Sequence, residues 1–547
     1  MTAVRAMRTA MAGPRTAEHP ATARRRFAVA CLVAGLAFAE IASAVSQPAP
    51  IVALDSGAVS GRSQDGIGVF LGIPYAAPPT GERRWVAPRQ PAGWTDIRAA
   101  AAYGPACPQT GLLETQTSED CLTLNVWAPA AAGADKRPVM VWIHGGGFNF
   151  GASSQPEYEG ANLARQGVVV VTLNYRLGPL GFFPHRKLAG APGPDSSGNY
   201  GLLDQIEALT WVRRNIAAFG GDPGNVTIFG QSAGSRSVSL LTLSPLADGL
   251  FHRAIAQSGG PIIGSEYLTP AFNGDGTSVA TMSDQLAARL GCDGAVDEIA
   301  CLRAKPAMEV VKAADCRTGL FDDGLFFAPI FDGTVLPRDP VAAALDGRRP
   351  RVPMIVGSTG DEGASYLRGV SDLTIATYHG FMAARFGAAA DRALVVFPAS
   401  RDDDVAGAID RFITIAVNAQ PARFMARSLE RAGSKAYLYR FTRKPNTARA
   451  RELGAFHGVD LAYVFGNMNN ADGYTDLDRT LARQVMAYWV NFARTGDPNG
   501  PGLTDWPVYR SATDENVEFA DVVRRENGLF RLESDFIDRA SRFGLTR

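Results

Sequence analysis

Short apolar runs typical of β-strands alternate with segments of helical periodicity along most of this chain. Two segments, Asn199–Phe219 and Asp476–Arg494, carry apolar residues near the 3.6-residue spacing of an amphipathic helix. Six runs have the length and composition of buried strands: Pro138–Ile143, Gly167–Leu173, Val226–Phe229, Arg253–Ser258, Val352–Gly357 and Ala436–Phe441. This alternation predicts an α/β fold, a mostly parallel sheet with helices covering its faces.

The composition suits one large folded unit behind an N-terminal leader. The chain has 547 residues, of which 46% are hydrophobic, so it can bury an extensive core. Length alone would suggest about two to four domains, but large single α/β domains exceed this number, and no repeat or low-complexity linker divides residues 45–547. Residues 1–44 hold six Arg and two Glu, which leaves 48 basic and 52 acidic residues in the remainder. This near-balance argues against nucleic-acid binding.

The first 44 residues have the pattern of an export signal. A basic stretch ending at Arg26 precedes the apolar run Phe27–Ala39 and the small-x-small sequence Ala42–Ala44. The 13-residue run is shorter than the about 20 apolar residues that a membrane anchor needs, and Glu40 ends it. Both Sec export and a twin-arginine signal fit this pattern. We therefore expect a secreted or periplasmic (cell-envelope) protein with no membrane span after the signal is removed.

The sequence Gly230-Gln231-Ser232-Ala233-Gly234 joins a predicted strand to a predicted helix. Glycine and serine are common in tight turns, so a simple turn is one interpretation. The other is a G-x-S-x-G nucleophile elbow, in which the glycines let strand and helix approach closely and the serine hydroxyl is exposed. The motif alone leaves both interpretations open.

A second glycine-rich stretch, Trp142–Phe148, also follows a predicted strand. Its three consecutive glycines, Gly145, Gly146 and Gly147, leave backbone N–H groups uncovered, so that two of them can point at a developing oxyanion. The alternatives are a flexible loop and a dinucleotide-binding turn. The latter requires G-x-G-x-x-G, whereas the sixth place counted from Gly145 is Phe150.

A serine nucleophile needs a general base, and one histidine suits this role best. In a hydrolase with a G-x-S-x-G elbow the order along the chain is nucleophile, acid, base. His144, His185 and His252 come too early for this order, and His379 lies in a predicted helix. His457 lies in a glycine-flanked loop after the last parallel strand predicted, and we therefore choose it as the base.

The acid is expected between the nucleophile and the base, just beyond a strand. Asp361 and Glu362 follow the run Val352–Gly357 and are both in the right place, and spacing alone does not choose between them. Asp332 and Asp339 also lie in this interval, where the default interpretation of a single carboxylate is a surface charge.

Several longer stretches make the assignment more specific. The chain resembles the type B carboxylesterases of the carboxylesterase and cholinesterase family, which have the α/β-hydrolase fold. The stretches that carry the resemblance span most of the chain after the leader: Gly72–Trp85, Ser118–Pro129, Asn174–Phe183, Phe219–Gly234, Phe327–Gly333 and Phe492–Asn499. The resemblance implies a single catalytic domain with large helical insertions.

The resemblance also implies roles for individual residues. The positions that match the catalytic triad of the family are Ser232 as nucleophile, His457 as base and Glu362 as acid, which settles the choice against Asp361. The positions that match the oxyanion-hole donors are Gly146, Gly147 and Ala233.

Four cysteines form two local pairs without the CxxC spacing of zinc or redox sites. In an exported protein such pairs indicate disulfides that close short loops. The resemblance implies the same pairs, Cys107–Cys121 and Cys292–Cys301. Cys316 is left over and is expected to be a buried thiol.

Two departures from the family pattern bear on the substrate. The residue before the nucleophile is usually glutamate in this family and is Gln231 here, which removes a negative charge that would attract cations. The choline-binding tryptophan of cholinesterases belongs to the first disulfide loop, and the 13 residues between Cys107 and Cys121 contain no aromatic residue. A choline-ester substrate is therefore not expected.

The sequence thus predicts a secreted serine carboxylesterase that hydrolyses a small-molecule ester through an acyl-enzyme, with no metal or organic cofactor. The alternatives within hydrolases are a lipase and an enzyme for a specialised ester, carbamate or polyester. A non-catalytic, cholinesterase-like binding protein is the alternative outside enzymes, and the filled catalytic positions oppose it. The sequence says nothing of the oligomeric state.

Overall fold

The computed structural model describes residues 49–111, 117–130, 136–188, 198–261, 279–315, 324–330, 332–346, 352–371 and 373–542. The predicted signal at residues 1–44 and Cys316 lie outside these ranges. Residues Pro48–Arg547 cluster as one compact unit. The strands are β1 (Ile51–Leu54), β2 (Gly57–Ser60), β3 (Arg62–Gln64), β4 (Ile67–Pro74), β5 (Arg98–Ala99), β6 (Thr123–Pro129), β7 (Arg137–Ile143), β8 (Val169–Leu173), β9 (Gly221–Gln231), β10 (Arg253–Gln257), β11 (Met354–Thr359), β12 (Ala436–Phe441), β13 (Glu515–Phe519) and β14 (Val523–Asn527).

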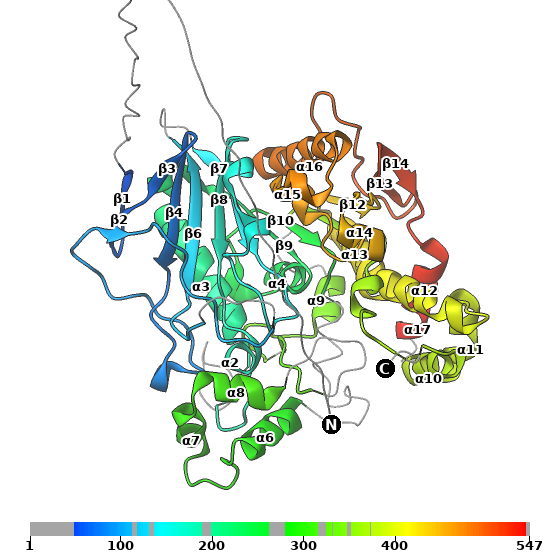
Figure 1. The fold of residues 1–547 in the computed structure, drawn as a ribbon, viewed down its shortest axis with the longest axis horizontal. Coiled ribbons are helices and arrows are strands. Elements are labelled where there is room, and N and C mark those ends of the chain that lie inside the picture. Colours follow the sequence, from blue (N-terminus) through cyan, green and yellow to red (C-terminus); the bar gives the residue numbers. More distant parts are fainter. Residues whose placement is uncertain are drawn as a thin grey trace, which may run out of the picture. The chain divides into compact units, whose positions relative to one another are not determined.

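The α-helices follow and separate these strands (Figure 1). They are α1 (Ala161–Ala164), α2 (Gly178–Gly181), α3 (Tyr200–Asn215), α4 (Ala233–Leu241), α6 (Val279–Arg289), α7 (Glu298–Ala304), α8 (Ala307–Ala314), α9 (Pro340–Asp346), α10 (Ile375–Phe386), α11 (Ala390–Val396), α12 (Asp402–Ile413), α13 (Gln420–Arg431), α14 (Ala448–Leu453), α15 (Leu461–Phe465), α16 (Asp476–Thr495) and α17 (Arg531–Arg542).

One large sheet organises the fold, and its strand order is β14-β13-β12-β11-β10-β9-β7-β8-β6-β4-β3. The strands from β8 across to β13 pair in parallel, whereas β6, β4 and β3 at one edge and β14 at the other pair antiparallel. The six predicted strands are β7 to β12, so the prediction of a mostly parallel sheet is confirmed. The antiparallel strands were not predicted: β3 and most of β14 are exposed and polar, whereas β4 and β6 are largely buried but were not among the six predicted runs.

The two faces of the sheet bury separate apolar cores. In β7 the side chains of Val139, Val141 and Ile143 join one core, and those of Met140 and Trp142 join the other. This split follows from the alternation of side chains along a strand. Helices α3 and α4 pack on the first face, while α15 and α16 pack on the second.

Two groups of helices are the predicted helical insertions. Helices α6, α7 and α8 lie together at one end of Figure 1, and α10, α11 and α12 lie together at another. The second group shares an apolar cluster of its own with α17, built around Phe386, Phe412 and Phe536. Within the described ranges, no helix combines the length and apolar character needed to cross a bilayer.

Candidate active site

Ser232 lies at a sharp turn between the end of β9 and the start of α4. Its backbone has φ 59° and ψ −124°, a strained conformation for a residue with a side chain. Both flanking positions must be glycine, because neighbouring backbone atoms lie too close to leave room for a side chain. A Cβ on Gly230 would lie 2.6 Å from the carbonyl of Gly234, and one on Gly234 would lie 2.0 Å from the Ile143 oxygen. The structure therefore supports the elbow interpretation of the motif over a simple turn.

The triple-glycine loop passes directly beside this turn. A Cβ on Gly145 would lie 3.0 Å from the Cβ of Ser232, so the two segments are in contact. Gly146 and Gly147 have φ values of 105° and 59°, which a larger residue would rarely adopt. Across the described residues, no hydrogen bond engages the N–H of Gly146 or Gly147. Ala233 is the first residue of α4, so its N–H has no partner within the helix.

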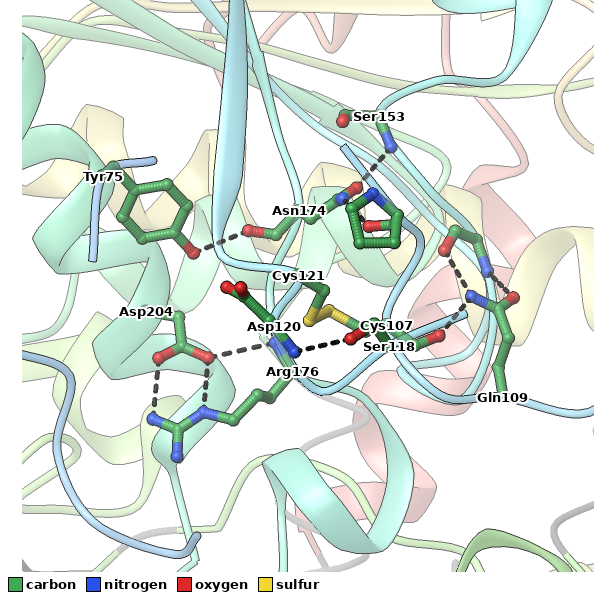
Figure 2. The surroundings of a disulfide bond; sticks show 12 residues. Tyr75, Cys107, Gln109, Ser118, Asp120, Cys121, Ser153, Asn174, Arg176 and Asp204 are labelled. Atoms are coloured by element: carbon green, nitrogen blue, oxygen red, sulfur yellow. Dashed lines mark hydrogen bonds and ion pairs between the residues drawn. A yellow bond between two sulfur atoms is a disulfide. The ribbon is translucent and has the colours of Figure 1, made fainter. Parts of the chain in front are cut away.

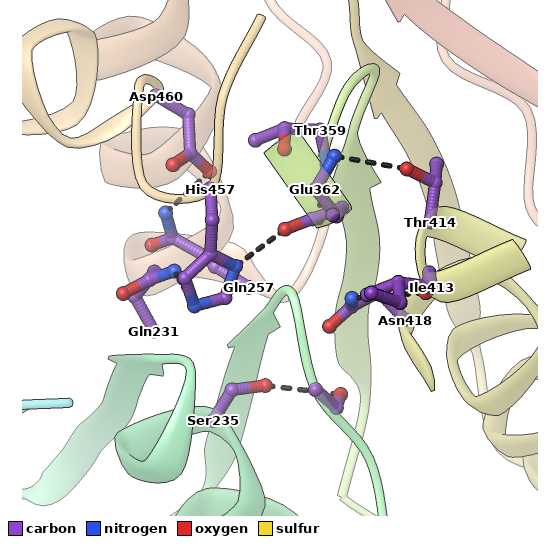
Figure 3. A network of polar contacts seen from close by, with 12 residues as sticks. Gln231, Ser235, Gln257, Thr359, Glu362, Ile413, Thr414, Asn418, His457 and Asp460 are labelled. Carbon is purple, nitrogen blue, oxygen red and sulfur yellow. Dashed lines mark hydrogen bonds and ion pairs between the residues drawn. The ribbon is translucent and has the colours of Figure 1, made fainter. Parts of the chain in front are cut away.

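Glu362 and His457 are joined by a hydrogen bond (Figure 3). Glu362 follows β11, is fully buried, and its Oε2 accepts a hydrogen bond from His457 Nδ1. Its Oε1 accepts the Thr359 N–H at 2.6 Å. Burial raises the pKa of Glu362, but attraction to His457 and the hydrogen bonds to the carboxylate outweigh it and hold the pKa below 4.5. The carboxylate therefore stays ionised at neutral pH.

The other candidate carboxylates have structural partners. Asp361 forms an ion pair with Lys444 at 2.8 Å and accepts the Ala455 N–H at 2.6 Å. Asp332 and Asp339 accept backbone N–H groups of their own turns. None of these three carboxylates is bonded to His457 in these contacts, whereas Glu362 is.

The histidines that were not chosen as the base lie in other environments. His144 is buried, stacks on Tyr175 at 4.5 Å, and bonds through Nδ1 to the Gly145 carbonyl at 2.8 Å. Burial lowers its pKa to about 4, so it is neutral. His185 lies beside Glu298, His252 accepts the Val226 N–H, and His379 lies on α10.

The Nε2 atom of His457 faces the residue next to the nucleophile. Nε2 of the Gln231 amide lies 3.1 Å from it, and Gln231 is 5% exposed. With Nδ1 hydrogen-bonded to Glu362, an amide N–H on the other side favours the neutral imidazole whose Nε2 carries a lone pair. The imidazole ring is thus held beside the elbow, between Glu362 on one side and Gln231 on the other.

A buried polar network around Asp460, three residues after His457, was not predicted. Asp460 accepts hydrogen bonds from Gln257 Nε2 at 2.9 Å and from the Tyr439 hydroxyl at 3.0 Å. Trp489 Nε1 donates to Gln257 Oε1 at 3.3 Å. Burial, helped by the charge of Glu362, raises the pKa of Asp460 to about 6. The position of an acid three residues after the base was the signal available in the sequence.

The turn that carries Glu362 is held by α12, which was also not predicted. Oδ1 of Asp410 accepts the N–H of Gly363 at 2.7 Å and of Ala364 at 3.0 Å. Thr414 Oγ1 accepts the N–H of Glu362 at 2.9 Å (Figure 3). Thr414 begins a π-helical segment, Thr414–Ala419, between α12 and α13. Such segments are frequent at functional sites.

The structure contains both predicted disulfides, Cys107–Cys121 and Cys292–Cys301. The first connects through Gln109 to the chain that follows the triple-glycine loop (Figure 2). The Gln109 amide donates to the Gly151 carbonyl at 2.9 Å and accepts the Gly151 N–H at 2.8 Å. The disulfide loop therefore supports the segment that follows the three glycines.

Comparison with known proteins agrees with this geometry. Residues 48–536 match the model of the carboxylesterase family. The chain belongs to this family. It is 36% identical over 488 residues to fumonisin B1 esterase of Sphingopyxis macrogoltabida, covering 86% of both chains. It is 36% identical over 498 residues to para-nitrobenzyl esterase of Bacillus subtilis (strain 168), covering 87% of this chain and 96% of that one.

Solved structures show the same relationship. One PNB esterase structure superposes with a TM-score of 0.77 at 36% identity, covering 89% of this chain and 99% of the other. A thermophilic PNB esterase gives 0.78 at 34% identity with the same coverage. The chain is therefore a carboxylic-ester hydrolase with the α/β-hydrolase fold, as the sequence predicted. In the described part of this carboxylesterase, no three His, Cys, Asp or Glu side chains gather closely enough to hold a metal ion.

Proposed function

We propose that this carboxylesterase is a secreted enzyme that cleaves its ester through Ser232, His457 and Glu362. The observation that carries the proposal is the placement of the imidazole. His457 Nδ1 is bonded to the buried Glu362, and His457 Nε2 lies 3.1 Å from the side chain of the residue preceding Ser232. Catalytic hydrogen bonds often tighten only when substrate is bound, so a shift of the Gln231 amide lets Nε2 accept the Ser232 proton.

The reaction follows from these positions. Ser232 Oγ attacks the ester carbonyl while His457 Nε2 takes its proton, and Glu362 stabilises the resulting imidazolium. The N–H groups of Gly146, Gly147 and Ala233 hold the oxyanion. The carbon–oxygen bond to the alcohol breaks as His457 returns the proton to the leaving alkoxide. Water then attacks the acyl-enzyme by the same route and releases the acid.

We also propose that choline esters are not substrates, because two features that would attract a quaternary ammonium group are missing. Gln231 replaces the usual glutamate, and the loop between Cys107 and Cys121 offers no aromatic residue to a quaternary ammonium group. We expect butyrylthiocholine to be hydrolysed no better than the thioester in which carbon replaces the ammonium nitrogen. A strong preference for the choline thioester would contradict this.

Burst kinetics with p-nitrophenyl acetate test the mechanism. The wild-type protein should release about one equivalent of p-nitrophenol rapidly if deacylation limits turnover, and Ser232→Ala should show neither burst nor turnover. Full turnover by Ser232→Ala would refute the assignment. Export is tested separately: N-terminal sequencing of the exported protein should begin just after Ala44, and an intact N-terminus would contradict the signal.

A further inference from the structure

Two residues stand out by their exposure around the nucleophile. From Val226 to Ser244 every residue is buried except Ser232 and Arg236, which are both partly exposed. These two positions are four apart, and α4 begins at Ala233. Residues four apart lie on the same side of a helix, so the exposed parts of Ser232 and Arg236 are expected to face the same side.

The direction of the Arg236 side chain follows from helix geometry. The Arg236 N–H donates to the Ser232 carbonyl at 3.0 Å, which places Arg236 one turn beyond the nucleophile. In an α-helix the Cα–Cβ bond tilts toward the N-terminus, so a long side chain covers the turn before its own position. The Arg236 side chain therefore leans toward the elbow and Ser232.

Arg236 has no carboxylate partner in the part of the chain that the structure describes. Its Nε is buried and lacks a hydrogen bond. The more deeply buried Arg176 and Arg423 are paired with Asp204 and Asp514. Arg440, which is partly exposed like Arg236, also has a buried Nε without a hydrogen bond, but it lies over the ring of Phe530. A buried or half-buried guanidinium without an anion is costly, which points to an anion that arrives with a ligand.

The nearby acids already have partners. Glu362 is bound to His457, and Asp460 accepts hydrogen bonds from Gln257 and Tyr439. The residue beside the nucleophile is the uncharged Gln231. Arg236 is therefore a cation one helical turn beyond Ser232 that has no acidic partner among the described residues.

We propose that Arg236 binds a carboxylate of the substrate, so that this enzyme prefers esters that carry a second, negatively charged group. The class includes monoesters of dicarboxylic acids and acyl esters of hydroxy acids. A guanidinium is suited to this role because it binds a carboxylate through two parallel hydrogen bonds. The inference rests on the proposed function, because it takes Ser232 as the reacting group.

Two pairs of esters test the proposal, each matched in shape. Methyl hydrogen succinate is compared with methyl 4-methylpentanoate, and 3-acetoxypropanoate with 3-methylbutyl acetate. In each pair an isopropyl group replaces the carboxylate, and the two pairs place the charge in the acyl part or in the alcohol. We expect kcat/KM to favour the anionic ester of at least one pair roughly 10- to 100-fold, the worth of a charge-assisted hydrogen-bonded pair.

Variants assign that preference to one side chain. Arg236→Gln should remove most of the preference, Arg236→Lys should retain part of it, and Arg213→Gln, which changes an exposed arginine on α3, should leave it unchanged. The preference of the wild type should also shrink between about 0.01 M and 1 M salt, as the Debye length falls from about 30 Å to 3 Å.

Each outcome decides the proposal. Equal rates within both pairs for the wild type, or a preference that Arg236→Gln leaves intact, would overturn it. Hydrolysis of the neutral esters by the wild type would show that the proposed function survives such a failure. If Arg236→Gln does not fold, the wild-type ratios and their salt dependence still decide whether an anion site exists, and Arg236→Lys decides whether it is this residue.

Discussion

Replacing Glu362 by glutamine changes one hydrogen bond of the site while keeping its shape. Glu362 accepts the Thr359 N–H through Oε1 at 2.6 Å and the His457 Nδ1–H through Oε2. In Glu362→Gln the amide oxygen can keep the first bond, which turns the amide NH2 toward His457. Two donors then face each other, so the imidazole must shift its proton to Nε2, where it can no longer accept the Ser232 proton.

The size of the effect follows from this wrong tautomer. The same acid-to-amide exchange in a Ser-His-Asp triad lowers kcat about 10⁴-fold. At about 1.36 kcal/mol per tenfold change, this corresponds to roughly 5.5 kcal/mol of transition-state stabilisation. Glu362 is buried and hydrogen-bonded to His457 Nδ1, as the acid of such a triad is, so we expect a loss of similar size in kcat for p-nitrophenyl acetate. Substrate binding should change much less.

Asp361→Asn is the matched control, one residue away. The Asn side chain can still accept the Ala455 N–H, and it loses only the ion pair with the exposed Lys444. Such surface pairs contribute about 1 kcal/mol or less, and activity should stay within about threefold of the wild type. Melting curves check that both variants fold. A larger loss in Asp361→Asn than in Glu362→Gln, or a loss below about 30-fold in the latter, would refute the assignment of the acid.

Three further changes give measurable outcomes. Gln231→Glu places a carboxylate beside His457 and stabilises its protonated form, so the acid limb of kcat/KM against pH should move about one unit higher; a shift to lower pH would contradict the contact. Burial raises the pKa of Asp410 to about 6 in the folded protein, so its ionised form destabilises the fold above that pH and not below about pH 4. Asp410→Asn should accordingly raise the free energy of unfolding at pH 8 by at most about 3 kcal/mol and leave it unchanged near pH 4; lower stability at pH 8 would show that the charge is needed. Replacing Cys107 and Cys121 by serine opens a loop of sequence separation 14 and should cost about 3 kcal/mol in thermal or urea unfolding, whereas an unchanged midpoint would show that the disulfide contributes nothing.

The central strands and the elbow were predictable because their signals are local. Buried parallel strands such as β8, with the sequence Val169–Leu173, are continuous apolar runs. The glycines around Ser232 reflect the close approach of β9, α4 and the carbonyl of Ile143. The apolar run and the G-x-S-x-G motif can each be recognised within a short window of sequence. The family resemblance then added the choice of Glu362 over Asp361.

The support around the acid could not be predicted in the same way. Asp410 and Thr414 lie about 50 residues after the turn that they hold, on a helical insertion whose placement depends on tertiary packing. The contact of Gln231 with His457 joins residues 226 positions apart. Single acids and amides of this kind have no periodic pattern, and a surface position is the default expectation for them.

Active-site labelling tests the central claim most directly. A fluorophosphonate should modify the wild-type protein at one residue, and peptide mass spectrometry should locate it at Ser232. Ser232→Ala should take up no label, while His457→Ala and Glu362→Gln should label far more slowly because the hydroxyl has lost its base. Label on a different serine, or labelling of the His457→Ala protein at the wild-type rate, would contradict a triad built from these residues.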